Sequence, residues 1–442
     1  MKRFRLNLSY VQLIVLGFTA LILLGTALLC LPAATRDGHA VSFLDALFTA
    51  TSATCVTGLV VADTFTFWST FGQIVILLLI QIGGLGFMTV FALFAMLSGR
   101  QIGLRDRMFL MQSAGSIELA GVVRLIRSIL LGTLAIESCG AALLAIPFVR
   151  DYGAAGIFKA VFTSISAFCN AGFDLLGTGG SLIGCERDPL VMIPIMLLIL
   201  LGGIGFLVWS DILKNGLHPR KYALHTKVVL SVTGILLFGG AVLFFLFERD
   251  GVLRGMNLGE AVMQSFFLSV TPRTAGFATV QYGALSEASW ILTLFLMMIG
   301  GAPGSTAGGI KVTTFAVLVL DAFASARQSN QITVFKRRLD EKLVKQAVAV
   351  CVVYAGLVLT GSLVLCAIQP LSARDVLLEV ISAASTVGLS TGITASLAPL
   401  SKCMVVLLMF GGRVGGMTLA LLVSARRSPP PVDRPPEKIL VG

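Results

Sequence analysis

Two glycine-containing patterns each recur four times along the chain, and they constrain the fold more than any other feature. The first ends in glycine followed by leucine or phenylalanine, and its copies centre on Gly58, Gly172, Gly276 and Gly388. The second is a glycine pair within an apolar stretch, at 83–84, 202–203, 300–301 and 411–412. The similarity extends upstream, where residues 45–53 align without a gap to residues 159–167. Because the patterns alternate, the chain is predicted to consist of four related units.

Long apolar stretches surround these patterns. The chain has 442 residues, of which 56% are hydrophobic and only 12% charged, and this composition excludes a soluble globular or a disordered protein. About 20 apolar residues cross a bilayer. Eight spans are predicted, the sixth of them interrupted, at about 11–32, 70–97, 126–149, 190–212, 227–248, 288–323, 344–368 and 400–424. We therefore expect an all-α integral membrane protein.

The basic residues support one orientation of these spans. An even number of spans places both termini on one side, and most of the 33 Lys and Arg residues fall on that side, in segments 1–10, 98–127, 213–227, 324–345 and 425–442. The positive-inside rule places this side in the cytoplasm. The net charge of +11 therefore reflects basic residues that mark the cytoplasmic side of the membrane, and it is not interpreted as a sign of nucleic-acid binding. The same basic segments could in addition contact anionic lipid or a cytosolic partner.

A short semi-polar segment precedes the first glycine pattern in every unit. It has room for roughly ten helical residues, about 15 Å or half a bilayer, so it must enter and leave the membrane on the same side. Each unit is thus predicted to be a helix, a re-entrant loop and a second helix, with the four units pseudo-symmetric around one central pore. Their boundaries are 1–97, 98–212, 213–323 with a broken second helix, and 324–442 with a cytosolic C-terminal tail.

The predicted geometry suits a monovalent cation. Non-helical backbone at membrane depth is tolerated where it lines a water-filled path or is buried in protein. A ring of backbone carbonyls can replace the hydration shell of such a cation, and glycine allows the backbone angles that turn the carbonyls inward. The alternative is close packing of helices through small residues. We favour packing for the glycine pairs and an ion pathway for the four loops.

At these residues the sequence resembles the Trk/Ktr/HKT superfamily of cation transporters, over nearly the whole chain and in all four units. Eight spans and a short basic N-terminus resemble the Ktr-type membrane subunit most. The resemblance implies potassium uptake stimulated by Na⁺, in the cytoplasmic (inner) membrane of a bacterium. It also implies a homodimer with one pore in each protomer, and a cytosolic ring of nucleotide-binding (RCK-type) regulatory subunits. No organic cofactor is expected on this chain.

The resemblance also implies a set of site residues. The K⁺ selectivity filter would comprise the glycine of each loop and the two residues before it, namely Val56, Thr57, Gly58, Asn170, Ala171, Gly172, Thr274, Ala275, Gly276, Thr386, Val387 and Gly388. In the family a serine at the first filter glycine accompanies sodium permeation, so Gly58 favours potassium. The third loop departs from simple symmetry because Thr271, Pro272 and Arg273 precede it, and a pseudosymmetric filter is expected.

The sixth span is interrupted by a run of small residues, from which no helix is expected because glycine and proline both disfavour it. A phosphate-binding loop is rejected, since that motif needs lysine directly after its glycine and Ile310 precedes Lys311 here. In the family this place holds a flexible intramembrane gate. The predicted gate comprises Gly300, Gly301, Pro303, Gly304, Ser305, Thr306, Gly308, Gly309 and Lys311. A passive kink is the alternative.

Three ionisable residues lie within or close to the spans, where charge is functional by default. Arg413 follows the fourth glycine pair and is predicted to be an electrostatic barrier below the filter, matching a family arginine, or else a salt bridge between helices. Lys311 is expected to anchor the gate. Glu137 has no assignable partner, and a structural hydrogen bond is favoured over an ion site. Acidic residues near the loops on the outer side could collect cations together, and each by itself is interpreted as a helix cap or a solvated charge: Asp45, Asp63, Asp174, Glu260, Asp375 and Glu379.

Three other functions compete with Ktr-type potassium uptake. A Trk-type K⁺ or K⁺/Na⁺ symporter shares the same pattern. A secondary transporter for an organic solute would have inverted repeats with one or two broken helices, whereas the four units here have similar orientation. An enzyme is not expected, because His39, His218 and His225 all lie in predicted loops and no hydrolase or metal motif occurs.

Overall fold

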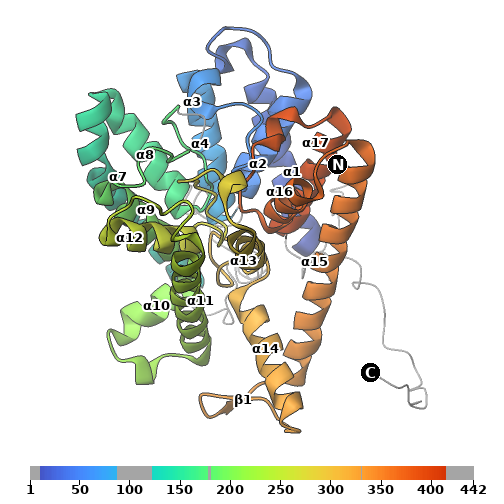
Figure 1. Cartoon of the computed structure of the whole chain (residues 1–442). Helices are drawn as coiled ribbons and strands as arrows, with labels where there is room; N and C mark the ends of the chain where they lie inside the picture. The colour runs from blue at the N-terminus through green and yellow to red at the C-terminus, as the bar shows by residue number, and fades with distance from the viewer. Residues whose placement is uncertain (1–9, 87–121, 178–180, 330, 415–442) are drawn as a thin grey trace, which may run out of the picture.

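The computed structural model describes residues 10–86, 122–177, 181–329 and 331–414, and within these ranges the chain is mainly helical (Figure 1). The all-α class expected from the sequence is confirmed. The described strands form one two-stranded antiparallel hairpin, β1 (Thr333–Val334) with β2 (Arg337–Arg338). This hairpin lies at the lower end of the long helices α14 and α15 in Figure 1.

The same order of helices occurs four times along the chain. The first helices are long: α1 (Tyr10–Leu29), α7 (Val122–Tyr152), α11 (Leu224–Glu248) and α15 (Glu341–Ile368). A short helix follows each of them: α2 (Phe43–Cys55), α8 (Ala155–Phe168), α12 (Leu258–Val270) and α16 (Ala373–Ser385). After an irregular turn comes a third helix: α4 (Thr70–Leu85), α9 (Pro189–Gly203), α13 (Glu287–Met298) and α17 (Pro399–Val414).

Smaller elements join these helices. The part of the chain that the structure describes has three further helices, α3 (Thr64–Phe67), α10 (Phe206–Asn215) and α14 (Val312–Ala326). Its 3₁₀ turns are η1 (Pro32–Ala34), η2 (Pro219–Lys221), η3 (Tyr282–Ala284) and η4 (Ile393–Ser396). The short helices begin where polar side chains satisfy free N–H groups. The Ser42 hydroxyl accepts a hydrogen bond from Asp45 N, and Asn257 and Glu260 form a capping box at α12.

The third helix of each unit packs on the short helix of the next unit. Four such contacts occur: α4 with α8, α9 with α12, α13 with α16, and α17 with α2. The last of these joins the fourth unit back to the first, so the units form a closed cycle. Within each unit the first helix also packs on its own short helix, as α7 does on α8 and α11 on α12. The ends of the four short helices are thereby held near one another.

Three described helices are long and apolar enough to cross a bilayer by themselves: α7 from Ile126, α11 and α15. The expected fourth span, 190–212, differs from a straight helix because α9 and α10 meet at 95°. The chain bends where Gly205 adopts a φ of 92°, a conformation that side chains resist. The remaining apolar helices are shorter than the expected spans. Parts of the second and eighth expected spans, 87–97 and 415–424, lie outside the described residues.

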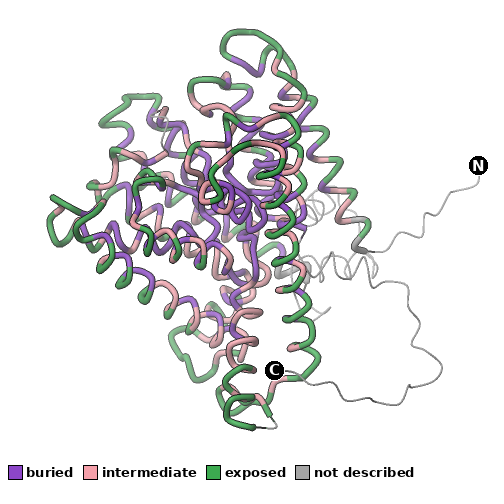
Figure 2. The backbone as a smooth tube through the Cα atoms, turned by 45° about the vertical axis from the view of Figure 1, so that its right-hand side comes forward, coloured by how far each residue is buried: buried purple, intermediate pink, exposed green. Residues whose placement is uncertain are grey.

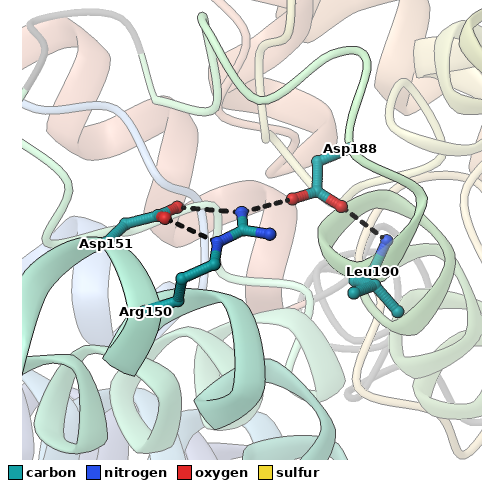
Figure 3. Close-up of polar contacts among 4 residues, drawn as sticks. All are labelled: Arg150, Asp151, Asp188 and Leu190. Atoms are coloured by element: carbon teal, nitrogen blue, oxygen red, sulfur yellow. Dashed lines mark hydrogen bonds and ion pairs between the residues drawn. The ribbon is translucent and has the colours of Figure 1, made fainter.

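Burial follows a membrane-protein pattern. Figure 2 shows buried backbone gathered at the centre, while the outer helices expose their outward faces. Exposed apolar side chains occur along α7, α11 and α15, including Leu134, Phe238 and Leu363 at 63%, 61% and 63%. These faces are suited to lipid. A group of polar contacts lies at the C-terminal end of α7, where Arg150 forms ion pairs with Asp151 and Asp188 (Figure 3). Asp188 also accepts a hydrogen bond from Leu190 N at the start of α9.

Candidate functional site

A turn of similar backbone geometry follows each of the four short helices. Its first residue is not glycine but has a left-handed φ, as in Val56 (58°), Asn170 (59°), Thr274 (69°) and Thr386 (51°). Two residues later comes a glycine, again with positive φ, as in Gly58 (93°), Gly172 (68°), Gly276 (78°) and Gly388 (96°). Non-glycine residues in this region are strained, and such strain gathers at functional sites.

The N–H groups of these turns are bound on the side of the short helices. Thr57 N and Val387 N donate to the carbonyls of Ser52 and Ser382, each over 2.8 Å. The hydroxyls of the same two serines accept from Gly58 N and Gly388 N, at 3.1 and 3.0 Å. In the third turn Thr271 takes this place and its hydroxyl donates to the Phe277 carbonyl at 2.6 Å.

The carbonyl oxygens of the same turns are left available. No hydrogen bond from another described residue reaches the carbonyl oxygens of the twelve expected filter residues. Eleven of the twelve residues are buried, and Gly388 is partly exposed. Buried backbone carbonyls normally have partners, so this many unpaired carbonyls in one small region call for an occupant.

The four turns also close into a ring. A Cβ atom added to Gly58 would lie less than 3.0 Å from the carbonyl oxygen of Ala171 in the second turn. In the same way Gly172 meets Ala275, Gly276 meets Val387, and Gly388 meets Thr57. Each turn therefore approaches the next, and the fourth approaches the first. A side chain at any of the four glycines would push the neighbouring carbonyl away.

A cavity of about 330 Å³ adjoins this ring on one side. All four ring glycines line it, together with the carboxylate-bearing residues Asp63 and Asp174. Burial raises the pKa of Asp174, which lies in the loop after the second turn, to about 6. Near pH 7 both the carbonyl dipoles and the Asp174 carboxylate therefore favour a cation in the cavity.

The other expected outer carboxyl groups make local contacts within the protein or lie at the start of a helix. Asp45 contacts Lys402 of α17 at 2.6 Å, and Glu260 completes the capping box of α12. Asp375 lies in the first turn of α16 and is partly buried. Glu379 is fully buried, and its Oε1 accepts a hydrogen bond from the Thr394 hydroxyl at 2.5 Å.

The glycine pairs allow the third helices to pack against the short ones. A Cβ on Gly83, Gly202 or Gly412 would overlap the carbonyl oxygen near the end of its own unit's short helix, at Thr54, Phe168 or Ala384. This contact supports the packing interpretation of the pairs. The third unit differs, because Gly300 instead approaches the Gly308 carbonyl within its own loop.

That loop, residues 299–311, contacts the first residue of the fourth turn and does not line the cavity, so we describe it as lying beneath the ring. A Cβ on Gly308 would overlap the Thr386 hydroxyl of the fourth turn. Ala302 N donates to the Gly203 carbonyl at 2.9 Å, and the Thr306 hydroxyl donates to the Phe168 carbonyl at 3.1 Å. The expected gate residues thus come together as one non-helical segment between Met298 and Val312, in contact with the second and fourth units.

Arg413 links this loop to the opposite side of the ring. Its Nη1 donates to the Thr306 carbonyl at 2.5 Å, and its Nη2 donates to the carbonyls of Gly83 and Gly84 in α4. The guanidinium therefore joins loop 299–311 to the first unit. Lys311 holds the loop from within, since its Nζ donates to the Ala307 carbonyl at 2.7 Å.

Glu137 acquires a partner that the sequence did not identify. Gln81 of α4 donates to Glu137 Oε2 at 3.1 Å, and the Ser164 hydroxyl donates to the Glu137 backbone carbonyl at 2.7 Å. The carboxyl therefore takes part in a contact between α4, α7 and α8. Ser52, Ser382 and Thr394 were likewise overlooked as site residues. The serines could have been found, because they recur six residues before Gly58 and Gly388.

Comparisons with known proteins place the chain among cation transport proteins. A family model described as TrkH, cation transport protein, matches residues 10–429. The potassium/sodium uptake protein NtpJ of Enterococcus hirae is 41% identical and covers 100% of this chain and 99% of its own. The Ktr system potassium uptake protein B of Bacillus subtilis is 39% identical over 92% and 91% of the two chains. The corresponding protein of Vibrio alginolyticus is 36% identical over 98% and 94%.

A solved structure shares the fold. It is the potassium transporter TrkH from Vibrio parahaemolyticus, which has a TM-score of 0.76, covers 96% of this chain and 86% of its own, and is 18% identical. The matches to the three relatives span nearly the full length of this chain and of each relative, and the family model covers most of this chain. The chain therefore belongs to the TrkH family of cation transport proteins.

Proposed function

We propose that this chain is the potassium-conducting membrane subunit of a bacterial Ktr-type uptake system. The observation that carries the proposal is the closed ring of four turns, whose twelve carbonyl oxygens accept no hydrogen bond from a described residue and whose residues are buried apart from the partly exposed Gly388. A partly dehydrated K⁺ ion passing through the ring exchanges water oxygens for carbonyl oxygens. The relatives named for potassium uptake, which match over nearly their whole length, support the choice of ion.

The backbone of the four turns sets the selectivity. Serines 52 and 382 hold the N–H groups away from the axis, so the carbonyls remain directed at the ion. The C-terminal ends of α2, α8, α12 and α16 lie directly before the turns and add negative potential from the helix dipoles. The filter is therefore built from Val56, Thr57, Gly58 and the nine equivalent residues of the other three turns.

The segment 299–311 is the gate, and the described conformation is closed. The loop lies under the ring, and Arg413 fixes it to α4 while placing a positive charge on the ion path. Opening requires the Arg413–Thr306 contact to break and the loop to withdraw. A cytosolic ring of nucleotide-binding subunits drives this movement in the proposed system, as the name "Ktr system" of two relatives suggests for a multi-part assembly.

The proposal also covers the assembly of the chain, its orientation in the membrane and its dependence on sodium. The chain forms a homodimer in the bacterial cytoplasmic membrane, with both termini in the cytoplasm and one pore in each protomer. The four units run over 1–97, 98–212, 213–323 and 324–442. Na⁺ stimulates uptake or is carried together with K⁺, and the combined potassium/sodium name of one relative favours including sodium.

The test is rescue of growth at low potassium in bacteria that lack their own uptake systems. The full-length chain should be expressed with a matched cytosolic subunit, with and without Na⁺. We expect growth at micromolar K⁺ and a loss of preference for K⁺ over Na⁺ in Gly58→Ser, whose side chain would displace the Ala171 carbonyl. Failure to rescue, with the protein confirmed in the membrane, would overturn the proposal.

A K⁺/Na⁺ symporter is the second candidate, and the same relative's name is the observation that favours it. The two are separated by ion flux in proteoliposomes with opposed gradients. A symporter drives K⁺ uphill when only a Na⁺ gradient is imposed. A channel-like subunit lets K⁺ run down its own electrochemical gradient whatever the Na⁺ gradient is.

A further inference from the structure

The short helix of the fourth unit contains a carboxylate where the other units have neutral residues. Glu379 lies six residues before the end of α16 and is 0% exposed. Counted in the same way from the ends of their own short helices, the equivalent residues are Thr49 in α2, Phe162 in α8 and Gln264 in α12. The charge therefore occurs once in an otherwise similar fourfold arrangement.

Gln264 and Glu379 make the same kind of contact with different chemistry. Gln264 Nε2 donates to the Thr279 hydroxyl at 2.6 Å, while Glu379 Oε1 accepts from the Thr394 hydroxyl at 2.5 Å. Both side chains are completely buried. An amide carries no charge and needs no counter-ion, whereas a buried carboxylate needs one.

No described lysine or arginine provides that counter-charge. The ion pairs in the described ranges do not include Glu379, and its Oε2 accepts no hydrogen bond from a described residue. The nearby titratable group is Asp375, one turn earlier in α16, which adds negative charge. Glu379 is therefore a fully buried acid with one free oxygen and a negative neighbour.

The carboxyl is also connected to the cavity above the ring. Thr394 and Ser390 both line that cavity, beside the ring glycines. The Thr394 hydroxyl lies 3.1 Å from the Ser390 hydroxyl as well as 2.5 Å from Glu379. One carboxylate and two hydroxyls thus converge next to the cavity from which cations enter. Oxygen ligands of this kind suit a hard cation.

We propose that Glu379, Thr394 and Ser390 form a Na⁺ site at the edge of the outer cavity, separate from the carbonyl ring. Na⁺ neutralises the buried carboxylate and orders the segment after the fourth turn, where Ser390 also accepts from Gly392 N at 2.9 Å. The site thereby couples external sodium to the fourth turn of the filter. This inference rests on the proposed cation-transport function.

The first test measures binding, independently of transport. Purified full-length protein in detergent, free of K⁺, is equilibrated with radioactive ²²Na⁺ at pH 7.5, with N-methyl-D-glucamine holding the ionic strength constant. We expect saturable Na⁺ binding in the natural protein and its loss in Glu379→Gln, which gives the fourth unit the amide chemistry of Gln264. Asp375→Asn is the matched control and should retain binding. Equal Na⁺ binding by Glu379→Gln and the natural protein would overturn the site.

The second test measures K⁺ uptake into proteoliposomes against external Na⁺ at fixed pH. Na⁺ stimulation should disappear in Glu379→Gln and persist in Asp375→Asn. Thr394→Val, which keeps the side-chain shape, should weaken Na⁺ binding about tenfold, so the site stays testable if Glu379→Gln fails to fold. The uptake is then repeated at several pH values. A pH dependence of K⁺ uptake that is lost in Glu379→Gln, with no dependence on Na⁺, would overturn the sodium site in favour of a bound proton. Intact Na⁺ binding without K⁺ uptake would support the site and reject the proposed function.

Discussion

The carbonyl ring and the layer directly beneath it follow opposite rules. In the ring, all four units contribute a turn with two left-handed residues, and each glycine approaches the next turn in the cycle. Beneath it, one unit contributes the loop 299–311 and another contributes Arg413. A site that surrounds an ion benefits from four equivalent walls. A site that opens and closes needs an asymmetric part, because one segment must move against the rest.

The largest expected effect comes from breaking the symmetric layer. Gly276→Ala should lower K⁺ uptake by about a hundredfold, because its Cβ would displace the Val387 carbonyl and so distort two turns at once. Uptake of ⁸⁶Rb⁺ into proteoliposomes measures the effect. Gly255→Ala is the matched control, since Gly255 has a φ of 80°, close to the 78° of Gly276, but nothing within 4 Å of an added Cβ. Equal losses in both variants would mean that backbone strain, and not the ring contact, is responsible.

The next effect has the opposite sign and comes from the asymmetric layer. Arg413→Gln removes the charge and the contacts to Thr306 and α4, so K⁺ flux without the cytosolic subunit should rise on the order of tenfold. Deletion of residues 304–309 should raise it similarly. The flux is measured in proteoliposomes with and without the partner subunit and its nucleotide. Unchanged flux and unchanged nucleotide dependence in the deletion would reject the gate.

A smaller effect is expected at the cavity above the ring. Because burial raises the pKa of Asp174 to about 6, this carboxylate is charged at pH 7.5 and becomes neutral as the external pH falls below 6. Uptake at limiting K⁺ should therefore fall about two- to threefold over that range, through weaker cation attraction. Asp174→Asn should have the low uptake at both pH values. Asp37→Asn, in an exposed loop, should leave the pH profile unchanged, and a profile unaltered by Asp174→Asn would contradict the assignment.

The smallest effect concerns closure of the cycle of units. The Lys402–Asp45 ion pair, 2.6 Å long and partly exposed, joins α17 of the fourth unit to α2 of the first. Asp45→Asn should cost about 1 kcal/mol of stability, a usual value for such pairs. Thermal unfolding in detergent should show a midpoint lower by a few degrees. The exposed Arg338–Glu341 pair offers a control, because Glu341→Gln should leave the midpoint unchanged.

Local patterns in the sequence were sufficient to locate the turns of the ring. Gly58, Gly172, Gly276 and Gly388 could be identified because each follows a short semi-polar segment, and a repeated pattern is visible without tertiary contacts. The bend after α9 could not be found in this way. Residues 190–209 contain no charged residue, and the 95° angle depends on Gly205 adopting a positive φ against the loop residue Pro303.

Hydrogen-bond partners that lie far apart along the chain could not be predicted from the sequence. Arg413 was recognised as an unusual charge, but its acceptors are carbonyls of Thr306, Gly83 and Gly84, and any residue type can provide a carbonyl. Gln81 and Glu137 lie in different predicted units. The sequence places Glu379 among the outer acids, because nothing in its neighbourhood along the chain indicates that it is fully buried.

The sequence by itself determined that the chain is a helical membrane protein, that it has four related units, and which glycines end the short segments. Hydropathy and backbone freedom are properties of residue types, so they can be read along the chain. The tertiary structure alone decided that the four turns close into a ring, that a loop of one unit lies beneath it, and which charges are buried. These depend on distances between residues far apart in sequence, which only the packed helices bring together.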